Sequence, residues 1–207
     1  LVKDSMKMLV EQLREQDKVA IVVYAGAAGL VLPSTSGEEK ETILEAIEKL
    51  EAGGSTAGGA GIKLAYKTAR NYFIKGGNNR VILCTDGDFN VGVTDFNTLK
   101  GMIAEKRKSG ISFTTLGFGS GNYDEQLMEQ LADAGDGNYS YIDNEREAKK
   151  VLQRQLSSTL ATVAQDVKIQ VEFNPATVKE YRLIGYENRL LKNEDFNNDQ
   201  VDAGDIG

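Results

Sequence analysis

The fold is decided by a short apolar segment, NNRVILCTD at residues 78–86. Its unbroken run of apolar side chains predicts a strand that is buried on both faces, as in the middle of a parallel sheet. A second run of this kind, KVAIVVYA at residues 18–25, predicts another such strand. The chain is therefore expected to contain a sheet whose two faces are both covered.

Segments with helical spacing alternate with the predicted strands. Apolar residues recur with the period of an amphipathic helix in six segments: residues 2–16, 37–50, 59–74, 95–109, 122–135 and 144–163. Further strands are predicted at 29–33, 111–119 and 138–143, the first of them at an edge because Pro33 cannot donate to a central ladder. This alternation predicts an α/β fold, a doubly wound and mostly parallel sheet with helices on both faces.

The pattern changes after the last of these helices. Residues 166–175, DVKIQVEFNP, and residues 181–187, YRLIGYE, alternate apolar and polar side chains, which predicts antiparallel strands. We therefore expect one domain over 1–163 and the start of a β-rich second domain, truncated, over 164–207. A doubly wound domain normally begins with a strand, whereas this chain begins with a helix, so the first strand is expected upstream of Leu1.

Composition excludes several classes of function. The 207 residues carry a formal charge of -7 with both signs interspersed, which argues against nucleic acid and anionic membranes as partners. Histidine is absent, which excludes Ser-His and Cys-His nucleophile pairs and histidine-based zinc sites. The longest apolar stretch, residues 19–32, is too short to span a bilayer, so no transmembrane segment is predicted.

A glycine-rich loop precedes one of the predicted helices. Residues 51–61, EAGGSTAGGAG, place five glycines around Ser55 and Thr56. A phosphate-binding loop does not fit, because lysine is absent after Gly59, and a dinucleotide fingerprint does not fit, because no strand precedes the loop. The glycines would let the Thr56 hydroxyl approach a neighbouring strand end closely. Ser55 is expected to bond to the backbone or to lie at the rim of the same site.

Carboxylates follow the strand at residues 78–86. Asp86 stands at its carboxyl end, where open α/β sheets bind ligands, and Gly87 allows a sharp turn behind it. Asp88 and Asn90 either order this turn or contact the same ligand, and a simple strand-ending turn is the alternative for the whole stretch. A threonine hydroxyl and an aspartate are hard oxygen ligands suited to Mg²⁺ or Ca²⁺.

Two motifs carry a resemblance to a known family. GGSTAGGAGIKLAY and VILCTDGDFNVG resemble the threonine and aspartate motifs of the von Willebrand factor type A (VWA) domain. The segment from Val171 onward resembles the region that follows this domain in the bacterial YfbK-like subgroup. The resemblance implies a metal-ion-dependent adhesion site (MIDAS) that holds Mg²⁺, or Mn²⁺ or Ca²⁺, through Thr56 and Asp86, with Ser55, Gly87, Asp88 and Asn90 at its possible rim. The family's first motif, Asp-x-Ser-x-Ser, is absent from the sequence and is expected upstream of Leu1, so metal binding by this chain is expected to be weak or absent.

The resemblance also implies a function. It implies a non-enzymatic adhesion or assembly module, in which a carboxylate from a partner protein completes the coordination of the metal. Bacterial relatives of this type are often exported to the periplasm or cell surface or anchored by lipid. A metal-independent VWA scaffold is the first alternative. The second is an enzyme that transfers phosphoryl groups through Asp86, since Asp-x-Asp at a strand end is similar to haloacid-dehalogenase phosphatases.

Overall fold

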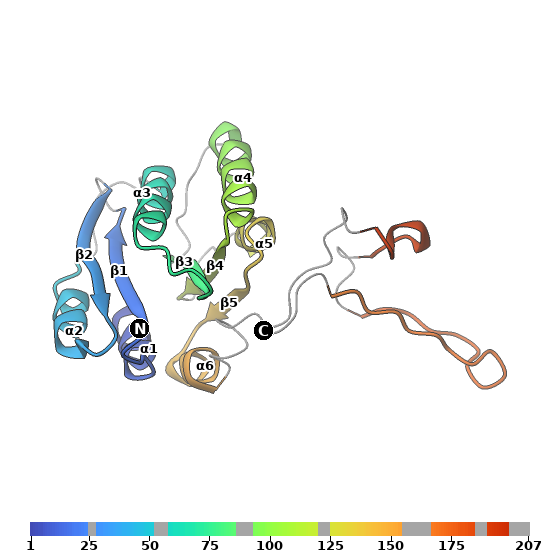
Figure 1. Cartoon of the computed structure of the whole chain (residues 1–207). Coiled ribbons are helices and arrows are strands. Elements are labelled where there is room, and N and C mark those ends of the chain that lie inside the picture. Colours follow the sequence, from blue (N-terminus) through green and yellow to red (C-terminus); the bar gives the residue numbers. More distant parts are fainter. Residues whose placement is uncertain are drawn as a thin grey trace. The chain divides into compact units, whose positions relative to one another are not determined.

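The computed structural model describes residues 1–24, 28–51, 58–85, 93–119, 125–154, 167–184 and 190–198. The chain divides into two compact units, Leu1–Ala161 and Thr162–Gly207. The first unit contains α1 (Val2–Glu11), β1 (Lys18–Val23), β2 (Gly29–Ser36), α2 (Lys40–Glu48), α3 (Gly58–Asn71), β3 (Asn79–Thr85), α4 (Val93–Arg107), β4 (Ile111–Phe118), α5 (Glu125–Ala134), β5 (Tyr139–Ile142) and α6 (Glu145–Lys149), which continues as a π-helix over Lys150–Arg154 (Figure 1).

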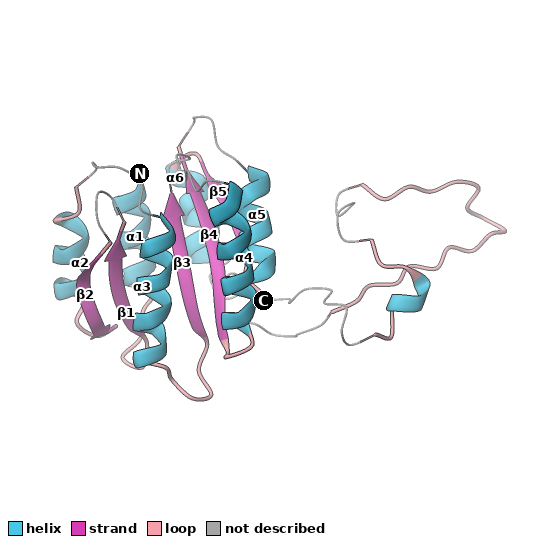
Figure 2. Ribbon diagram, turned by 90° about the horizontal axis from the view of Figure 1, so that it is seen from above, coloured by secondary structure: helices cyan, strands magenta, loops and turns pink. Residues whose placement is uncertain are grey.

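The strands of the first unit form two sheets. β3, β4 and β5 are parallel and lie in that order, and β1 pairs with β2 in an antiparallel ribbon. Figure 2 shows α3 and α4 on one face of the sheets and α1 and α6 on the other. The doubly wound α/β fold predicted from the alternation of strands and helices is therefore confirmed.

Two helices connect the two sheets. α3 packs against both β1 and β3, on the face that it shares with α4. On the opposite face α1 packs against both α2 and α6, and the Met6 sulfur lies 3.9 Å from the sulfur of Cys84 in β3. No hydrogen-bonded ladder joins β1 to β3 within the described ranges. The position of one sheet relative to the other therefore depends on helix packing.

The core follows the alternation of side chains along β3. Val81 and Leu83 pack with α3, α4 and α5, around the fully buried Phe113 of β4. Ile82 and Cys84 point to the opposite face and are partly buried against the cluster that α1 and α6 cover. Both faces of β3 are therefore covered, as its apolar run predicts.

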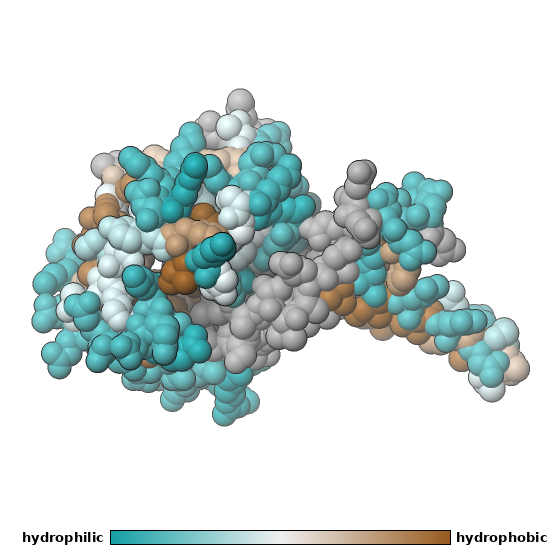
Figure 3. All heavy atoms as spheres, in the orientation of Figure 1, coloured by the Kyte–Doolittle hydropathy of each residue, from teal (hydrophilic) through white to brown (hydrophobic). Residues whose placement is uncertain are grey.

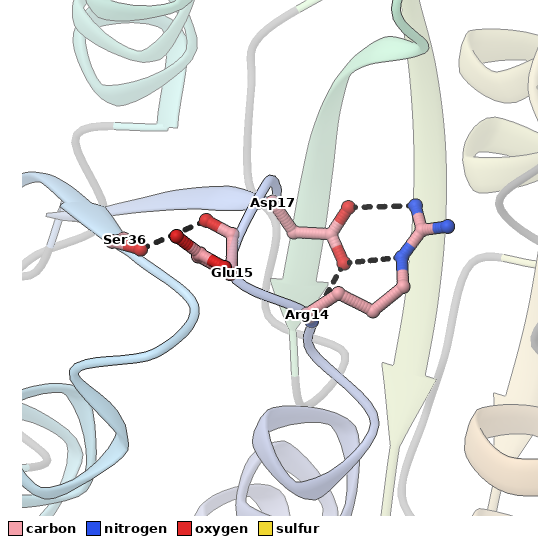
Figure 4. Close-up of polar contacts among 4 residues, drawn as sticks. All are labelled: Arg14, Glu15, Asp17 and Ser36. Atoms are coloured by element: carbon pink, nitrogen blue, oxygen red, sulfur yellow. Dashed lines mark hydrogen bonds and ion pairs between the residues drawn. The ribbon is translucent and has the colours of Figure 1, made fainter.

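The corner between α1 and β1 differs from the predicted helix at residues 2–16. The Arg14 guanidinium donates to both carboxylate oxygens of Asp17, at 3.1 and 2.9 Å, and the Arg14 amide donates to one of them at 2.8 Å (Figure 4). The Ser36 hydroxyl donates to the Glu15 carbonyl oxygen at 2.9 Å, which ties the end of β2 to this corner. α1 ends at Glu11 because these local side-chain bonds compete with the helix.

The edge strand is longer than predicted. It was expected over residues 29–33, and β2 extends over Gly29–Ser36. Among the described residues it pairs only with β1, and the register shifts on either side of Ile21. Pro33 lies opposite this irregularity, as expected of a residue that cannot donate to a regular ladder.

The second unit differs from the predicted pair of antiparallel strands. No strand occurs in its described residues, which contain one 3₁₀ helix, Asn193–Asp195. The predicted turn is present, because the amide of Val178 donates to the Asn174 carbonyl oxygen at 2.9 Å, and the rings of Phe173 and Tyr181 stack across it. Ile169 and Ile184 remain more than three-quarters exposed. No buried face fixes the register of the two arms, which accounts for the missing ladder.

Candidate functional site

The candidate site lies at the carboxyl edge of the parallel sheet. β3 ends at Thr85, which pairs with Gly117 near the end of β4. α3 begins at Gly58, and because it leads through a short loop into the start of β3, its first turn lies at the edge where β3 ends. The end of β3 and the start of α3 therefore lie at one edge.

Tyr24 contacts both the end of β3 and the start of α3. The Tyr24 hydroxyl, directly after β1, donates to the Cys84 carbonyl oxygen of β3 at 2.8 Å. A Cβ placed on Gly61, in the first turn of α3, would stand 2.5 Å from the Cβ of Tyr24. The ends of β1 and β3 and the start of α3 are thus held within the reach of one side chain.

The end of β4 is fixed by its neighbour. The amide of Gly119 donates to the Ile142 carbonyl oxygen at 3.2 Å, and the Tyr141 hydroxyl donates to the carbonyl oxygen of Gly119. Gly119 adopts a φ of 106°, a conformation that L side chains rarely adopt, which explains the glycine at this position. The edge beside the candidate site is therefore anchored to β5.

The residues predicted to form the site lie outside the described residues. This applies to Thr56 and Asp86, the predicted metal ligands, and to the predicted rim of Ser55, Gly87, Asp88 and Asn90. The structure describes the residues on either side of them, from which the position of the edge follows. Within the described part of the chain, no three or more His, Cys, Asp or Glu side chains gather into a metal site.

The chemistry of Cys84 bears on the kind of metal that this edge can hold. Burial raises the pKa of its thiol to about 12, so the group stays protonated near neutral pH. Its sulfur lies on the face of β3 that α1 covers, 3.9 Å from the Met6 sulfur, and so does not point to this edge. The donors left to this edge are oxygens, which suits a hard cation.

Sequence reasoning missed Tyr24 and Gly61. Tyr24 follows an apolar run and resembles one more buried strand residue, and its partner in β3 is 60 residues away along the chain. A signal for Gly61 was present, because a glycine inside a helical pattern often has a packing reason. Together these two residues position α3 and β3, beside which the predicted ligands stand in the sequence.

Comparisons with known proteins show the family to which the chain belongs. The family described as von Willebrand factor type A domain matches residues 1–155. The chain belongs to this family. Residues 158–207 match the family described as the C-terminal region of the uncharacterized protein YfbK. The resemblance drawn from the threonine and aspartate motifs is therefore confirmed.

The chain also resembles individual proteins. It is 56% identical over 207 residues to the uncharacterized protein YfbK of Escherichia coli, covering all of this chain and 36% of that protein. The chain spans little more than a third of the length of the curated relatives that it matches. The crystal structure of the conserved hypothetical protein BatB from Bacteroides thetaiotaomicron shares the fold, with a TM-score of 0.61 and 23% identity over 75% of this chain and 85% of that one.

One structural neighbour carries a metal. Proximal thread matrix protein 1 from the mussel byssus, with a zinc-occupied MIDAS motif, has a TM-score of 0.55 and 20% identity over 74% of this chain and 40% of that one. VWA domains often bind a metal at a MIDAS site and commonly mediate protein interactions. Among the described residues, no helix is long and apolar enough to cross a bilayer.

Proposed function

We propose that this chain is a non-catalytic protein-binding module that acts through a divalent cation at the carboxyl edge of β3. The observation that carries the proposal is the bridge made by Tyr24, which brings the first turn of α3 and the end of β3 to one place. Thr56 precedes this turn by two residues, and Asp86 directly follows the end of β3. A hydroxyl and a carboxylate would thereby come to the same edge from the segments beside two elements.

The donor set fits a hard cation only in part. Thr56 and Asp86 would supply two oxygens, whereas Mg²⁺ requires six in octahedral array, so further protein groups and water must complete the shell. When bound, the cation would offer an open position to a carboxylate of a partner protein. The chain's own residues would fix the position of the cation, with Ser55, Gly87, Asp88 and Asn90 shaping the rim. We infer Mg²⁺, Mn²⁺ or Ca²⁺ rather than a soft metal.

Calorimetric titration of Mg²⁺ and Mn²⁺ tests this proposal. The form to use extends upstream of Leu1, because the expected Asp-x-Ser-x-Ser motif belongs there. Heat of binding should disappear in Thr56→Ala and in Asp86→Ala. The matched control is Asp143→Ala, since Asp143 is an exposed aspartate that follows β5 at the same edge and is not a predicted ligand. Absence of binding heat from the extended protein, or heat that survives both substitutions, would contradict the metal site.

A metal-independent VWA scaffold is the second candidate function. Only two ligands, Thr56 and Asp86, are predicted in this chain, and the described residues contain no cluster of three or more metal-binding side chains. Two ligands hold a divalent cation poorly, which favours a function without metal. Pull-down of a partner in the presence of EDTA separates the two. Binding that persists in EDTA and in Asp86→Ala supports the scaffold, and binding that requires Mg²⁺ supports the metal-dependent module. Turnover of a phosphate ester that disappears in Asp86→Asn would instead indicate an enzyme.

A further inference from the structure

A groove of about 480 Å³ lies between α3 and α4. Its lining contains four cationic side chains and no acidic one: Lys63, Lys67, Tyr66, Arg70, Asn71, Met102 and Lys106. Ligand pockets in proteins have volumes of roughly 300–1,000 Å³, so the groove is of a useful size. Figure 3 shows hydrophobic atoms among hydrophilic ones in the region between these two helices.

The cations of this groove have no acidic partner in the described part of the chain. Lys63, Lys67 and Arg70 project from α3 at intervals of four and three residues, which places them on one helical face. Lys106 faces them from α4 and is half-buried. The nearby acid Glu105 pairs with Lys108 at 2.9 Å. In a chain with a formal charge of -7, this is a local concentration of uncompensated positive charge.

The same groove contains an unsatisfied hydrogen-bond donor. Tyr66 is only 2% exposed, and its hydroxyl has no hydrogen-bond partner among the described residues. Its ring stacks on Phe113 with the ring centroids 6.0 Å apart, so the side chain is held in place. Burial raises the pKa of this hydroxyl well above its usual value, which keeps it a proton donor at neutral pH. A buried donor without an acceptor is rare in folded proteins, and a ligand or a water molecule would satisfy it.

We propose that the α3–α4 groove binds an acidic segment of a partner protein, one carboxylate of which accepts a hydrogen bond from Tyr66. The cations supply charge complementarity, and Met102 with the ring of Tyr66 supplies an apolar floor. The surface continues at the end of α3 with Tyr72, Phe73 and Ile74, each 40–48% exposed. A groove of this size with apolar residues beside it suits a peptide rather than a single inorganic ion.

The groove is separate from the candidate metal site. α3 begins at the carboxyl edge of β3 and ends near the opposite edge, where β3 begins. Its lining residues on α3 begin at Lys63 and end at Asn71, and those on α4 are Met102 and Lys106, so the groove extends away from the first turn of α3 toward that opposite edge. Binding there would require no cation. The module would therefore have two recognition surfaces of different chemistry.

Fluorescence anisotropy with a labelled peptide of alternating glutamate and phenylalanine residues tests the proposal on the full chain, in EDTA. The double variant Lys67→Gln/Arg70→Gln should weaken binding about tenfold, and added salt should weaken the binding of the unmodified chain. The control double variant, Lys18→Gln/Lys49→Gln, removes two exposed lysines outside the groove and should leave affinity unchanged. A peptide with glutamine in place of glutamate should not bind.

Tyr66→Phe separates a binding role from a structural one. Loss of the hydroxyl should weaken peptide binding about tenfold or more, and the ligand-free protein should melt about 2–4 °C higher because an unsatisfied donor is removed. Unchanged affinity in Tyr66→Phe or in the groove double variant would overturn the proposal, as would peptide binding that EDTA abolishes. Tighter binding of single-stranded DNA than of the acidic peptide would overturn it in favour of a nucleic-acid surface.

Discussion

Replacement of Gly61 by alanine should loosen the edge at which β1, α3 and β3 meet. The added Cβ would stand 2.5 Å from the Cβ of Tyr24, a separation that real side chains do not adopt, so Tyr24 must move. Overpacking of this kind costs about 1–3 kcal/mol. Displacement of Tyr24 also removes the 2.8 Å hydrogen bond to the Cys84 carbonyl oxygen, at a cost of about 0.5–1.5 kcal/mol. Alanine recovers about 0.5–1 kcal/mol of helix propensity, so the free energy of unfolding should fall by about 0.5–4 kcal/mol, with a central value of about 2 kcal/mol.

Urea denaturation followed by circular dichroism measures this change. A loss of 2 kcal/mol should lower the midpoint by about 1 M urea. The matched control is Gly59→Ala, two residues earlier in α3, where an added Cβ would meet nothing within 4 Å. That variant should be unchanged or more stable by about 0.5–1 kcal/mol. Equal midpoints for the two variants would refute the reasoning, because only Gly61 faces Tyr24.

Three further substitutions test the fold at other points. Arg14 lowers the pKa of Asp17 mainly through its side-chain hydrogen bond, so Asp17 stabilises the fold above about pH 4 and this contribution is lost as pH falls through its folded pKa. Asp17→Asn should therefore cost about 1 kcal/mol near neutral pH and flatten the acid limb of a stability–pH curve. Phe113→Ala should cost about 3–5 kcal/mol in urea denaturation, since Phe113 is fully buried. Asn144→Ala should cost about 1 kcal/mol in thermal melts, since its side chain accepts from the Glu147 amide at 3.0 Å at the start of α6.

The sequence predicted the elements of the first unit better than their ends. β3 and β4 were predictable because their apolar runs are long and bounded by polar turns. The end of α1 was not predictable, because its apolar pattern continues to Leu13. The Asp17 carboxylate accepts a hydrogen bond from the Arg14 amide, which periodicity does not show. The last helix was predicted as regular over 144–163, whereas it changes to a π-helix at Lys150. Neither the side-chain hydrogen bond nor the change of helix type alters the spacing of apolar residues, so hydrophobic periodicity does not predict them.

The ligands of the candidate site could be predicted from the sequence, whereas the contacts that position the neighbouring elements could not. Thr56 and Asp86 were chosen from glycine-rich spacing and from a strand end, and they stay a prediction. The contacts that position their neighbours join residues remote in sequence, as Tyr24 and Cys84 show. The basic groove was partly visible, since Lys63, Lys67 and Arg70 follow helical spacing. Its fourth cation, Lys106, comes from another helix, and only the fold brings it there.

The division of the strands into two sheets has a consequence for folding kinetics. The antiparallel ribbon and its covering helices α1 and α2 are built from residues 2–48, and the three parallel strands from residues 79–142. The ribbon pairs residues that lie near one another in sequence, whereas the parallel strands pair residues 24 to 32 positions apart, which favours earlier assembly of the ribbon. α3 lies between the halves in sequence and contacts strands of both. We therefore expect docking of this helix to couple the two halves, so that substitutions in it change the refolding rate more than substitutions in α2.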